Sequence, residues 1–341
     1  MKNLCHADEI IFLKNASNLY YFSGLNNPDA YILFVGEQKY YFTDDRYMEN
    51  AEKCLKEYSV HHIRDFDSIF SSNICHFEKL GIEDDLPYLF CKDLEKKGAI
   101  NFYSISKDIM FMRANKSSDE IKKIQKAQSI TDKVFSIILH QVKEGMTEKE
   151  LACILESELY KNGAEELAFR SIVAFDDNTS IPHAERTDRK MKNGSIITLD
   201  FGAKCENYCS DMTRTFFFGK ADEEMVKTYE IVLSAQQRAI EKAVVGMTTK
   251  ECDSIARSYF KLKGLDKFFL HSLGHGVGID IHEYPTVSPR SDAVIGENML
   301  ITIEPGLYFA GKYGIRIEDM IIFDKTGVIN LTKSPKNIII V

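Results

Sequence analysis

The sequence predicts an α+β protein of two domains, a small α/β domain at residues 1–115 and a larger, pseudo-two-fold domain at residues 116–341. Three observations lead to this prediction. The first hundred residues alternate short apolar runs with polar helical stretches. The remainder repeats a helix–helix–hairpin pattern at a period of about one hundred residues. Each copy of the repeat ends in a hairpin that carries two acids.

In the first domain, YILFVG and KYYFTD are predicted as paired strands, followed by a helix in DRYMENAEKCLKEY. A further strand, EKLGIED, precedes an amphipathic helix in CKDLEKKG, and short connections place such helices against a small sheet. No metal-ligand or nucleophile pattern occurs in this domain. The adjacent His61 and His62 are interpreted as surface residues. The second domain begins near MRANKSSDE, where Ser117 or Ser118 can cap a long helix.

The repeat consists of EGMTEKELACILESELYKNGA (144–164) and VGMTTKECDSIARSYFKLKGL (245–265). Each copy starts with Gly-Met-Thr, and Thr147 and Thr248 are the expected helix N-caps. Each copy also follows a long amphipathic helix and precedes one of the acidic hairpins. We therefore expect the two copies to pack about a pseudo-two-fold axis, to share one sheet and to bring their acids together at its centre.

The first acidic hairpin, LDFGAKCENYCSD, carries Asp200 and Asp211. If the chain reverses at Cys205–Glu206, the two carboxylates face each other directly, with Cβ atoms about 4.5–5.5 Å apart. Two such charges repel each other, and a bound cation is the usual compensation. The alternative, exposed turn acids, is disfavoured by the apolar residues around Asp200.

The second hairpin, ITIEPGLYFAGKYGIRIED, carries Glu304 and Glu318 symmetrically about Gly311. Between the two hairpins, HSLGHGVGIDIHE holds histidines among glycines that permit a close approach of the backbone to a bound group. By itself this segment is a weak signal, but beside four acids one imidazole ligand is expected. The histidines considered are His271, His275 and His282, and also His183 in NTSIPHAE.

Four carboxylates and one imidazole form a hard, oxygen-rich ligand set. It predicts two divalent metal ions, Mn²⁺ first, with Co²⁺, Fe²⁺ and Zn²⁺ as alternatives. Two ions about 3.5–4 Å apart could hold a bridging water, lower its pKa and stabilise an oxyanion. The pattern therefore indicates hydrolysis without a protein nucleophile, and no G-x-S-x-G motif competes for that role.

The overall composition excludes several other classes of protein. A formal net charge of −8 argues against a general nucleic-acid binder. No apolar window is long enough for a membrane span, and the N-terminus shows no signal-peptide pattern. The eight cysteines lack zinc spacing and are interpreted as reduced thiols. We expect a cytoplasmic protein.

Four motifs resemble the signature blocks of the pita-bread (M24-type) metallopeptidases, in their Xaa-Pro aminopeptidase and Xaa-Pro dipeptidase (prolidase) branch. These motifs are LDFGAKCENYCSDMTRTF, HSLGHGVGIDIHEYPTVSP, ITIEPGLYF and YGIRIED. NLYYFSGL and YYFTDDRYMENA are similar to the creatinase-type N-terminal domain. The resemblance implies a homodimeric aminopeptidase that cleaves Xaa-Pro bonds at the N-terminus of proline-containing peptides. The alternatives are a prolidase restricted to dipeptides and a non-catalytic peptide-binding module.

The resemblance also implies a metal-ligand set, in which one ion is held by Asp200 and Asp211 and the second by Asp211, His275, Glu304 and Glu318. Asp211 and Glu318 would bridge the two ions. Glu304 would shuttle a proton as well as bind metal.

Four further residues receive implied roles outside the ligand set. His183 would contact the substrate and support the leaving group, while His271 and His282 would line the pocket and steady the tetrahedral intermediate. Arg316 would pair with a metal-bound acid or hold a substrate carboxylate. The chain departs from many relatives at Asp176 and Asp177, where extra negative charge would favour a substrate amine or would merely lie in a surface loop.

Overall fold

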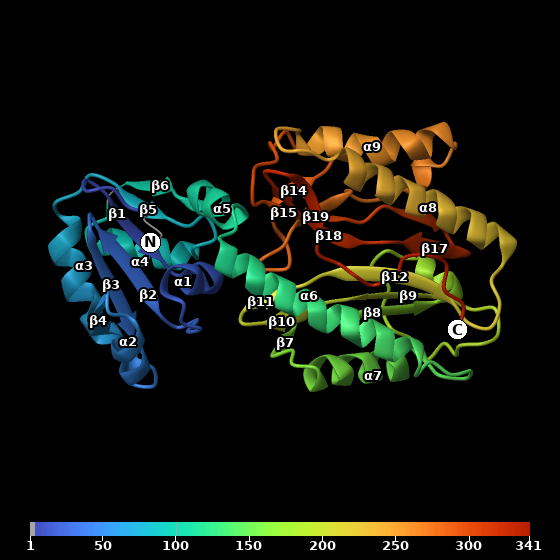
Figure 1. The fold of residues 1–341 in the computed structure, drawn as a ribbon. Helices are drawn as coiled ribbons and strands as arrows, with labels where there is room; N and C mark the ends of the chain where they lie inside the picture. The colour runs from blue at the N-terminus through green and yellow to red at the C-terminus, as the bar shows by residue number, and fades with distance from the viewer. Residues whose placement is uncertain (1–3, 100) are drawn as a thin grey trace. The chain divides into compact units, whose positions relative to one another are not determined.

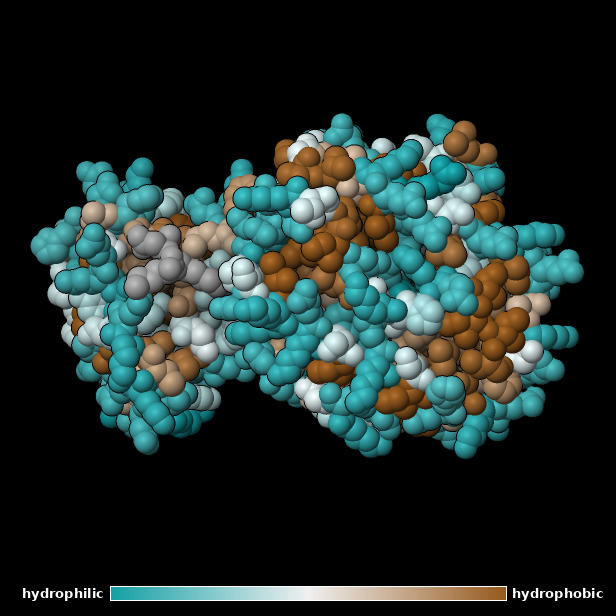
Figure 2. Space-filling view, in the orientation of Figure 1, coloured by the Kyte–Doolittle hydropathy of each residue, from teal (hydrophilic) through white to brown (hydrophobic). Residues whose placement is uncertain are grey.

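The computed structural model describes residues 4–99 and 101–341, and the chain divides into two compact units, residues 1–113 and 114–341 (Figure 1). All eight cysteines are free, as expected for reduced thiols. None of the helices in the described ranges combines the length and the apolar character that crossing a bilayer requires. Figure 2 shows that polar residues cover most of the visible face, with apolar patches among them.

The first unit contains one six-stranded sheet, made of β1 (Ile10–Leu13), β2 (Tyr31–Val35), β3 (Gln38–Thr43), β4 (Ser59–His62), β5 (Leu80–Ile82) and β6 (Phe102–Ser104). Its strand order is β4-β3-β2-β1-β5-β6. The strands β1, β2 and β3 pair antiparallel, whereas β4, β5 and β6 pair parallel with their neighbours. Its helices are α1 (Ala16–Ser23), α2 (Met48–Cys54), η1 (Ile63–Asp65), α3 (Phe66–Ile74), α4 (Tyr88–Lys96) and α5 (Ser106–Ala114).

Strand β1 is buried on both faces because helices cover both sides of this sheet. Ile11 and Leu13 pack in a cluster with residues of α1, α2 and α5. Ile10 and Phe12 pack in a second cluster with α3 and α4. Alternate side chains of a strand point to opposite faces, so one apolar run serves two cores. The predicted small sheet with helices against it is confirmed.

The second unit contains four long helices, α6 (Ser118–Leu139), α7 (Glu148–Lys161), α8 (Glu223–Lys242) and α9 (Thr249–Leu262), and two short ones, η2 (Asp176–Ser180) and η3 (Asp266–Phe268). Strands β8 (Ile172–Phe175), β9 (Ile196–Phe201) and β12 (Met212–Phe217) form one sheet. A second sheet consists of β13 (Gly274–Gly276), β14 (Glu283–Val287), β15 (Leu300–Ile303), β18 (Asp319–Asp324) and β19 (Gly327–Asn330). The shorter ladders are β7 (Glu166–Leu167), β10 (Ala203–Cys205) and β11 (Tyr208–Cys209), and β16 (Gly306–Phe309) with β17 (Tyr313–Arg316).

The sequence repeat corresponds to the helix pairs α6–α7 and α8–α9. Thr147 and Thr248 cap α7 and α9, as predicted, and each forms a capping box with the glutamate three residues later. The preceding glycines also match, because Gly145 N–H donates to Met191 O and Gly246 N–H donates to Ile295 O, both at 2.8 Å. The two copies therefore share the same local hydrogen bonds as well as the same motif.

The strands of this unit lie between the two helix pairs (Figure 1). Ile197 and Phe216 belong to the apolar core formed with α6 and α7. Their neighbours Ile196 and Phe217 belong to the other core, formed with α8 and α9. The central strands β9 and β12 are thus buried on both faces, and polar side chains on them must find partners inside the protein.

The expectation that both copies share one sheet is wrong in its hydrogen bonding. The two sheets keep separate ladders, and a backbone hydrogen bond from Glu318 N–H, just before β18, to Thr213 O on β12, 3.1 Å long, links them. Beside it, Thr215 Oγ1 donates to Arg316 O at 2.9 Å. The contact between the two sheets is therefore made partly by a side chain, that of Thr215.

The first acidic hairpin turns one residue later than predicted. Cys205 pairs with Tyr208, and Glu206 and Asn207 form the turn with φ of 50° and 62°, as a two-residue type I′ turn requires. Moving a turn by one residue moves each cross-strand partner by two. Asp200 therefore faces Thr213, and Asp211 becomes a diagonal neighbour on the same face.

In the second hairpin the predicted symmetry about Gly311 is confirmed. Ile303 pairs with Asp319, and Gly306 pairs with Arg316, so both ladders follow one register. This register sets Glu304 and Glu318, which lie between those pairs, opposite each other. Gly311 itself takes the left-handed φ of 69° at the turn.

Gly202 offers a test of the first hairpin's packing. A Cβ at this position would lie 1.9 Å from Ser210 O, a backbone atom that cannot move aside as a side chain could. Gly202→Ala should therefore lower the free energy of unfolding by about 1–3 kcal/mol, measured by urea denaturation. The matched control is Gly311→Asn, which lies in open space and takes a residue type that tolerates φ > 0. Equal stability of the two variants would contradict the packing described here.

Candidate metal centre

Asp200 lies on β9, 9 % exposed, and is held by an arginine from the second half of the unit. Its Oδ2 accepts a 2.6 Å hydrogen bond from Arg316 Nη2. Its Oδ1 is buried and has no hydrogen-bond partner among the described residues. Burying an unpaired carboxylate oxygen costs free energy unless a cation binds it. The unpaired Oδ1 of Asp200 therefore indicates that a cation other than a side chain binds here.

Threonine hydroxyls orient the two glutamates of the second hairpin. Thr213 Oγ1 donates to Glu318 Oε2 at 2.7 Å, and Thr302 Oγ1 donates to Glu304 Oε1 at 3.3 Å. The approach of β13 to β15 beside Thr302 depends on Gly274, because a Cβ there would lie 1.9 Å from Thr302 O. The sequence-based inference that glycines permit close backbone contact applies at this position.

His275, on β13, directs one ring nitrogen at the acids. Its Nδ1 contacts Gly276 O at 3.0 Å, a bond in which the ring nitrogen is the donor. Its Nε2 lies 3.5 Å from Asp211 Oδ2 and 3.5 Å from Glu304 Oε1. Burial lowers the pKa of His275 to about 4, so the ring is neutral near pH 7. A neutral imidazole whose free Nε2 faces carboxylates has the form that binds metal.

Asp211, His275 and Glu318 can each offer one ligand atom, and these atoms all lie within 4.8 Å of one another. Carboxylate oxygens combined with an imidazole suit divalent ions such as Mn²⁺ or Zn²⁺. Together with the unsatisfied Oδ1 of Asp200, these residues fit a divalent metal ion.

The buried carboxylates perturb one another strongly. Burial and then the charge of Glu318 raise the pKa values of Asp211 and Glu304 well above their usual range. Burial and then the charge of Asp200 raise the pKa of Glu318. In the metal-free protein the acids therefore resist full ionisation, and positive charge at the centre would favour it.

Arg316 connects Asp200 to a tyrosine–histidine pair. Its Nη1 donates to the Tyr308 hydroxyl at 2.7 Å, and that hydroxyl lies 2.9 Å from His271 Nε2. His271 Nδ1 is engaged with Ser272 O at 2.7 Å, so Nε2 accepts from the tyrosine. Burial and the charge of Arg316 lower the pKa of His271 to about 3. The sequence reasoning missed Tyr308, because GLYF indicates only a buried strand.

Buried acids on α7 and α9 position the loops that carry two of the predicted histidines. Glu148 accepts hydrogen bonds of 2.7 Å from the backbone N–H groups of Phe175 and Thr187, on either side of His183. In the second half, Arg257 pairs with an aspartate on α9 and donates to His271 O at 3.0 Å. Each repeat thus uses its second helix to fix a histidine-bearing segment.

The remaining predicted histidines lie at the edge of the centre. The His282 ring packs against the ring of His275, with centroids 4.4 Å apart, and it is more exposed than that ring. His183 is exposed, and its neighbour Pro182 accepts a 3.1 Å hydrogen bond from Arg316 Nη1 through its carbonyl. The structure therefore places His282 beside the acids and connects the loop of His183 to Arg316.

The two acids that depart from the family motif already have partners. Asp177 Oδ2 accepts a 2.9 Å hydrogen bond from Arg189 Nη2. Asp176 Oδ2 lies 3.8 Å from Lys192 Nζ and accepts a hydrogen bond from Ser195 Oγ. These contacts assign both carboxylates to the structure of the loop and favour that interpretation over capture of a substrate amine.

Comparisons with known proteins agree with this arrangement. The family described as "Metallopeptidase family M24" matches residues 122–325, and the "Creatinase/Prolidase N-terminal domain" matches residues 6–115. An Xaa-Pro dipeptidase of Pyrococcus horikoshii is 39 % identical over 97 % of this chain and 94 % of its own length.

Solved structures give the same result. An X-Pro aminopeptidase from Thermotoga maritima aligns with a TM-score of 0.92 at 34 % identity, covering 98 % of each chain. The prolidase from Pyrococcus furiosus aligns with a TM-score of 0.90 at 37 % identity, covering 96 % of this chain and 97 % of its own.

Fold and site together define a metal-dependent hydrolase. More narrowly, the chain belongs to metallopeptidase family M24 and carries a creatinase-type N-terminal domain. The predicted α+β fold with a pita-bread catalytic domain is confirmed, and so is the prediction of an enzyme. Membership of the family implies divalent metal ions, which the carboxylates and His275 are suited to bind.

Removing the metal should make stability depend on pH in a defined direction. An acid whose pKa is raised in the folded state adds stability below its unfolded pKa, near 4, and loses that stability as pH rises through the folded pKa. The carboxylates of the chelator-treated protein should therefore lower its melting temperature at pH 8 relative to pH 6, whereas the lowered pKa values of His271 and His275 act in the opposite direction. Added Mn²⁺ should raise the melting temperature more at pH 8.

Asp211→Asn is the control for this prediction, because the amide occupies the same volume and does not titrate. Its metal-free form should lose less melting temperature between pH 6 and pH 8 than the wild type, in scanning calorimetry at both pH values. The histidines are present in both proteins, so an equal pH dependence of the wild type and Asp211→Asn would refute the raised pKa of Asp211.

Proposed function

We propose that this metallopeptidase hydrolyses the bond between an N-terminal residue and a following proline. The observation that carries the proposal is the convergence of four acids and the neutral His275 in one buried centre. It is supported by relatives of similar length whose names specify Xaa-Pro substrates.

The proposed metal content is two divalent ions, Mn²⁺ first. Asp200 and Asp211 would hold one ion, and Asp211, Glu304, Glu318 and His275 would hold the other. When bound, such ions would activate a water molecule and polarise the scissile carbonyl. The unsatisfied Oδ1 of Asp200 supports a place for the first ion.

An Xaa-Pro bond is a tertiary amide, so its nitrogen must gain a proton as it leaves. Glu304 lies at the centre, 3.5 Å from His275 Nε2, and we assign it the transfer of a proton from water to the proline nitrogen. The exposed His183 would contact the substrate and support the leaving group, and His282 would line the pocket and steady the tetrahedral intermediate. His271 accepts the Tyr308 proton, so it would steady the tetrahedral intermediate only indirectly, by holding Tyr308 and Arg316 in place.

Of the two roles considered for Arg316, pairing with a metal-binding acid is the better supported. Its three nitrogens donate to Thr213, Pro182, Tyr308 and Asp200. These contacts use four of its five N–H groups, so a substrate carboxylate could bind only the second N–H of Nη2 unless it displaced one of them.

Two substrate lengths follow from the relatives. The Pyrococcus enzymes that match at 39 % and 37 % identity are named Xaa-Pro dipeptidases, which favours dipeptides. The Thermotoga structure is named an X-Pro aminopeptidase, which favours longer peptides, the length first expected from the sequence. We propose the dipeptide as the better substrate. A homodimer in the cytoplasm also stays a prediction.

The role of Glu304 can be tested by Glu304→Ala. Because this change removes both a metal ligand and the proton carrier, we expect Xaa-Pro hydrolysis to fall by at least about 100-fold, measured as proline released from Ala-Pro with added Mn²⁺. Glu297→Ala, which removes an exposed acid from the preceding segment, is the control. Wild-type turnover by a folded Glu304→Ala protein would remove Glu304 from the mechanism.

Substrate length can be decided by comparing Ala-Pro with Ala-Pro-Ala. We expect a higher kcat/KM for the dipeptide with the Mn²⁺-loaded enzyme, because the relatives at 39 % and 37 % identity are named Xaa-Pro dipeptidases. A higher kcat/KM for the tripeptide would assign the protein to the aminopeptidases. Failure to cleave either peptide, with Mn²⁺ bound, would reject the Xaa-Pro proposal.

A further inference from the structure

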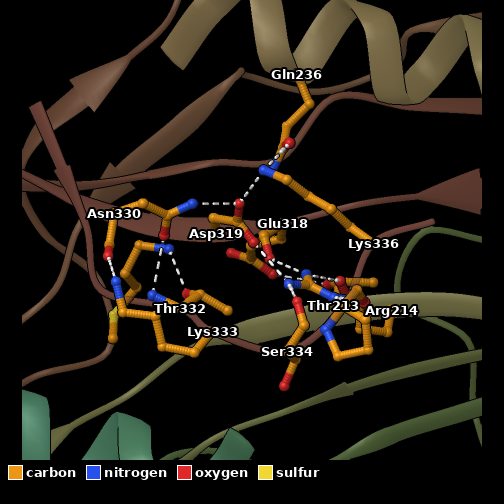
Figure 3. Close-up of polar contacts among 12 residues, drawn as sticks. Thr213, Arg214, Gln236, Glu318, Asp319, Asn330, Thr332, Lys333, Ser334 and Lys336 are labelled. Carbon is orange, nitrogen blue, oxygen red and sulfur yellow. Dashed lines mark hydrogen bonds and ion pairs between the residues drawn. The ribbon is translucent and has the colours of Figure 1, made fainter. Parts of the chain in front are cut away.

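Behind the candidate metal centre, Arg214 occupies a fully buried position on β12. It follows Thr213, whose hydroxyl donates to Glu318 Oε2 at 2.7 Å. Successive side chains of a strand point to opposite faces, so Thr213 faces the acids while Arg214 faces away from them. Figure 3 shows Arg214 near Ser334 and Lys336, which belong to residues 331–337 after β19, here called the C-terminal segment.

All five N–H donors of the Arg214 guanidinium have acceptors. Nη1 donates to Thr213 O at 3.0 Å and to Glu318 O at 2.5 Å. The other acceptors are Pro335 O at 3.0 Å from Nε, and Ser334 O at 2.9 Å and Asp319 Oδ1 at 2.7 Å from Nη2. One nitrogen therefore holds the main chain of two residues at the metal centre, and the other nitrogens are fixed by the C-terminal segment and Asp319.

Asp319, the residue after Glu318, is 1 % exposed and gathers three donors. Besides Arg214, it accepts hydrogen bonds from Asn330 Nδ2 at 2.7 Å and from Lys336 Nζ at 2.5 Å. Lys336 also donates to Gln236 Oε1 on α8 at 2.8 Å. Figure 3 shows these contacts converging on Asp319. A buried carboxylate with this many donors is held in one orientation.

The same segment is also tied to the other helix pair. Asp132, on α6, accepts hydrogen bonds from Ser334 N–H at 2.8 Å and from Ser334 Oγ at 2.6 Å. Contacts to α6 through Asp132 and to α8 through Gln236 fix the segment from both repeats. The carbonyl groups that receive Arg214 are thereby held in place relative to both halves of the unit.

We infer that Arg214 is a positioning residue for the metal centre, held in place by Asp319 and Lys336. It fixes the backbone of Glu318 and Thr213 and so keeps the Glu318 carboxylate aimed at the other ligands. The inference rests on the proposed metal site. A buried charge pair that only stabilises the fold would leave metal affinity unchanged, whereas a positioning residue sets it.

The test measures Mn²⁺ binding to the full-length, chelator-treated protein by isothermal titration calorimetry. Arg214→Lys keeps the charge but loses the planar fork of donors, and we expect Mn²⁺ affinity to fall about 10–100-fold. Lys336→Met removes a peripheral donor to Asp319 and keeps Arg214, so a smaller loss in the same direction is expected. This second variant decides the question if Arg214→Lys does not fold.

The matched control is Lys333→Met, an exposed lysine of the same segment whose Nζ contacts Asn330 O. It should bind Mn²⁺ as the wild type does. Saturating Mn²⁺ should restore most of the kcat of Lys336→Met, because its ligands remain present. Wild-type Mn²⁺ affinity in folded Arg214→Lys or Lys336→Met would overturn the positioning role of Arg214 and leave the proposed function standing. A wild type that binds no divalent ion would overturn the proposed function as well.

Discussion

Mutual repulsion among buried carboxylates is the constraint on which the second unit depends. Asp200, Asp211, Glu304 and Glu318 come from both halves of the repeat, and burial removes the water that would screen their charges. The fold can bring them together only if each is held by neighbouring donors and if positive charge enters the site. Arg316 supplies part of that charge through Asp200 Oδ2.

Backbone hydrogen bonds, a buried arginine and the packed helices hold the four acids close together. The separate ladders of β9–β12 and β15–β18 meet through the backbone at Thr213 and Glu318, and Arg214 binds the carbonyls on both sides of this junction. The two capped helix pairs bury both faces of the central strands. The acids are therefore mounted on strands whose backbone has little freedom, and a preorganised metal site requires such support.

Much of this could be predicted from the sequence, because each inference used a local rule. Helix caps at Thr147 and Thr248 follow from side-chain chemistry, and the symmetric second hairpin follows from Gly311. The first hairpin was placed one residue early, because nothing in KCENY marks Glu206 as a residue with φ of 50°. Tyr308 was missed because its hydroxyl function depends on Arg316 and His271, which only the folded chain brings together.

The formal charge of the candidate metal centre depends on Arg316 and on the number of divalent ions bound. The four carboxylates carry −4 when ionised, and Arg316 reduces the total to −3, since −4 + 1 = −3. One divalent ion would leave −1, whereas two would give +1. A centre with a positive total attracts a peptide carbonyl and the negative charge that develops on it during hydrolysis. The pairing of Asp200 with Arg316 therefore lowers the negative charge that bound divalent ions have to offset.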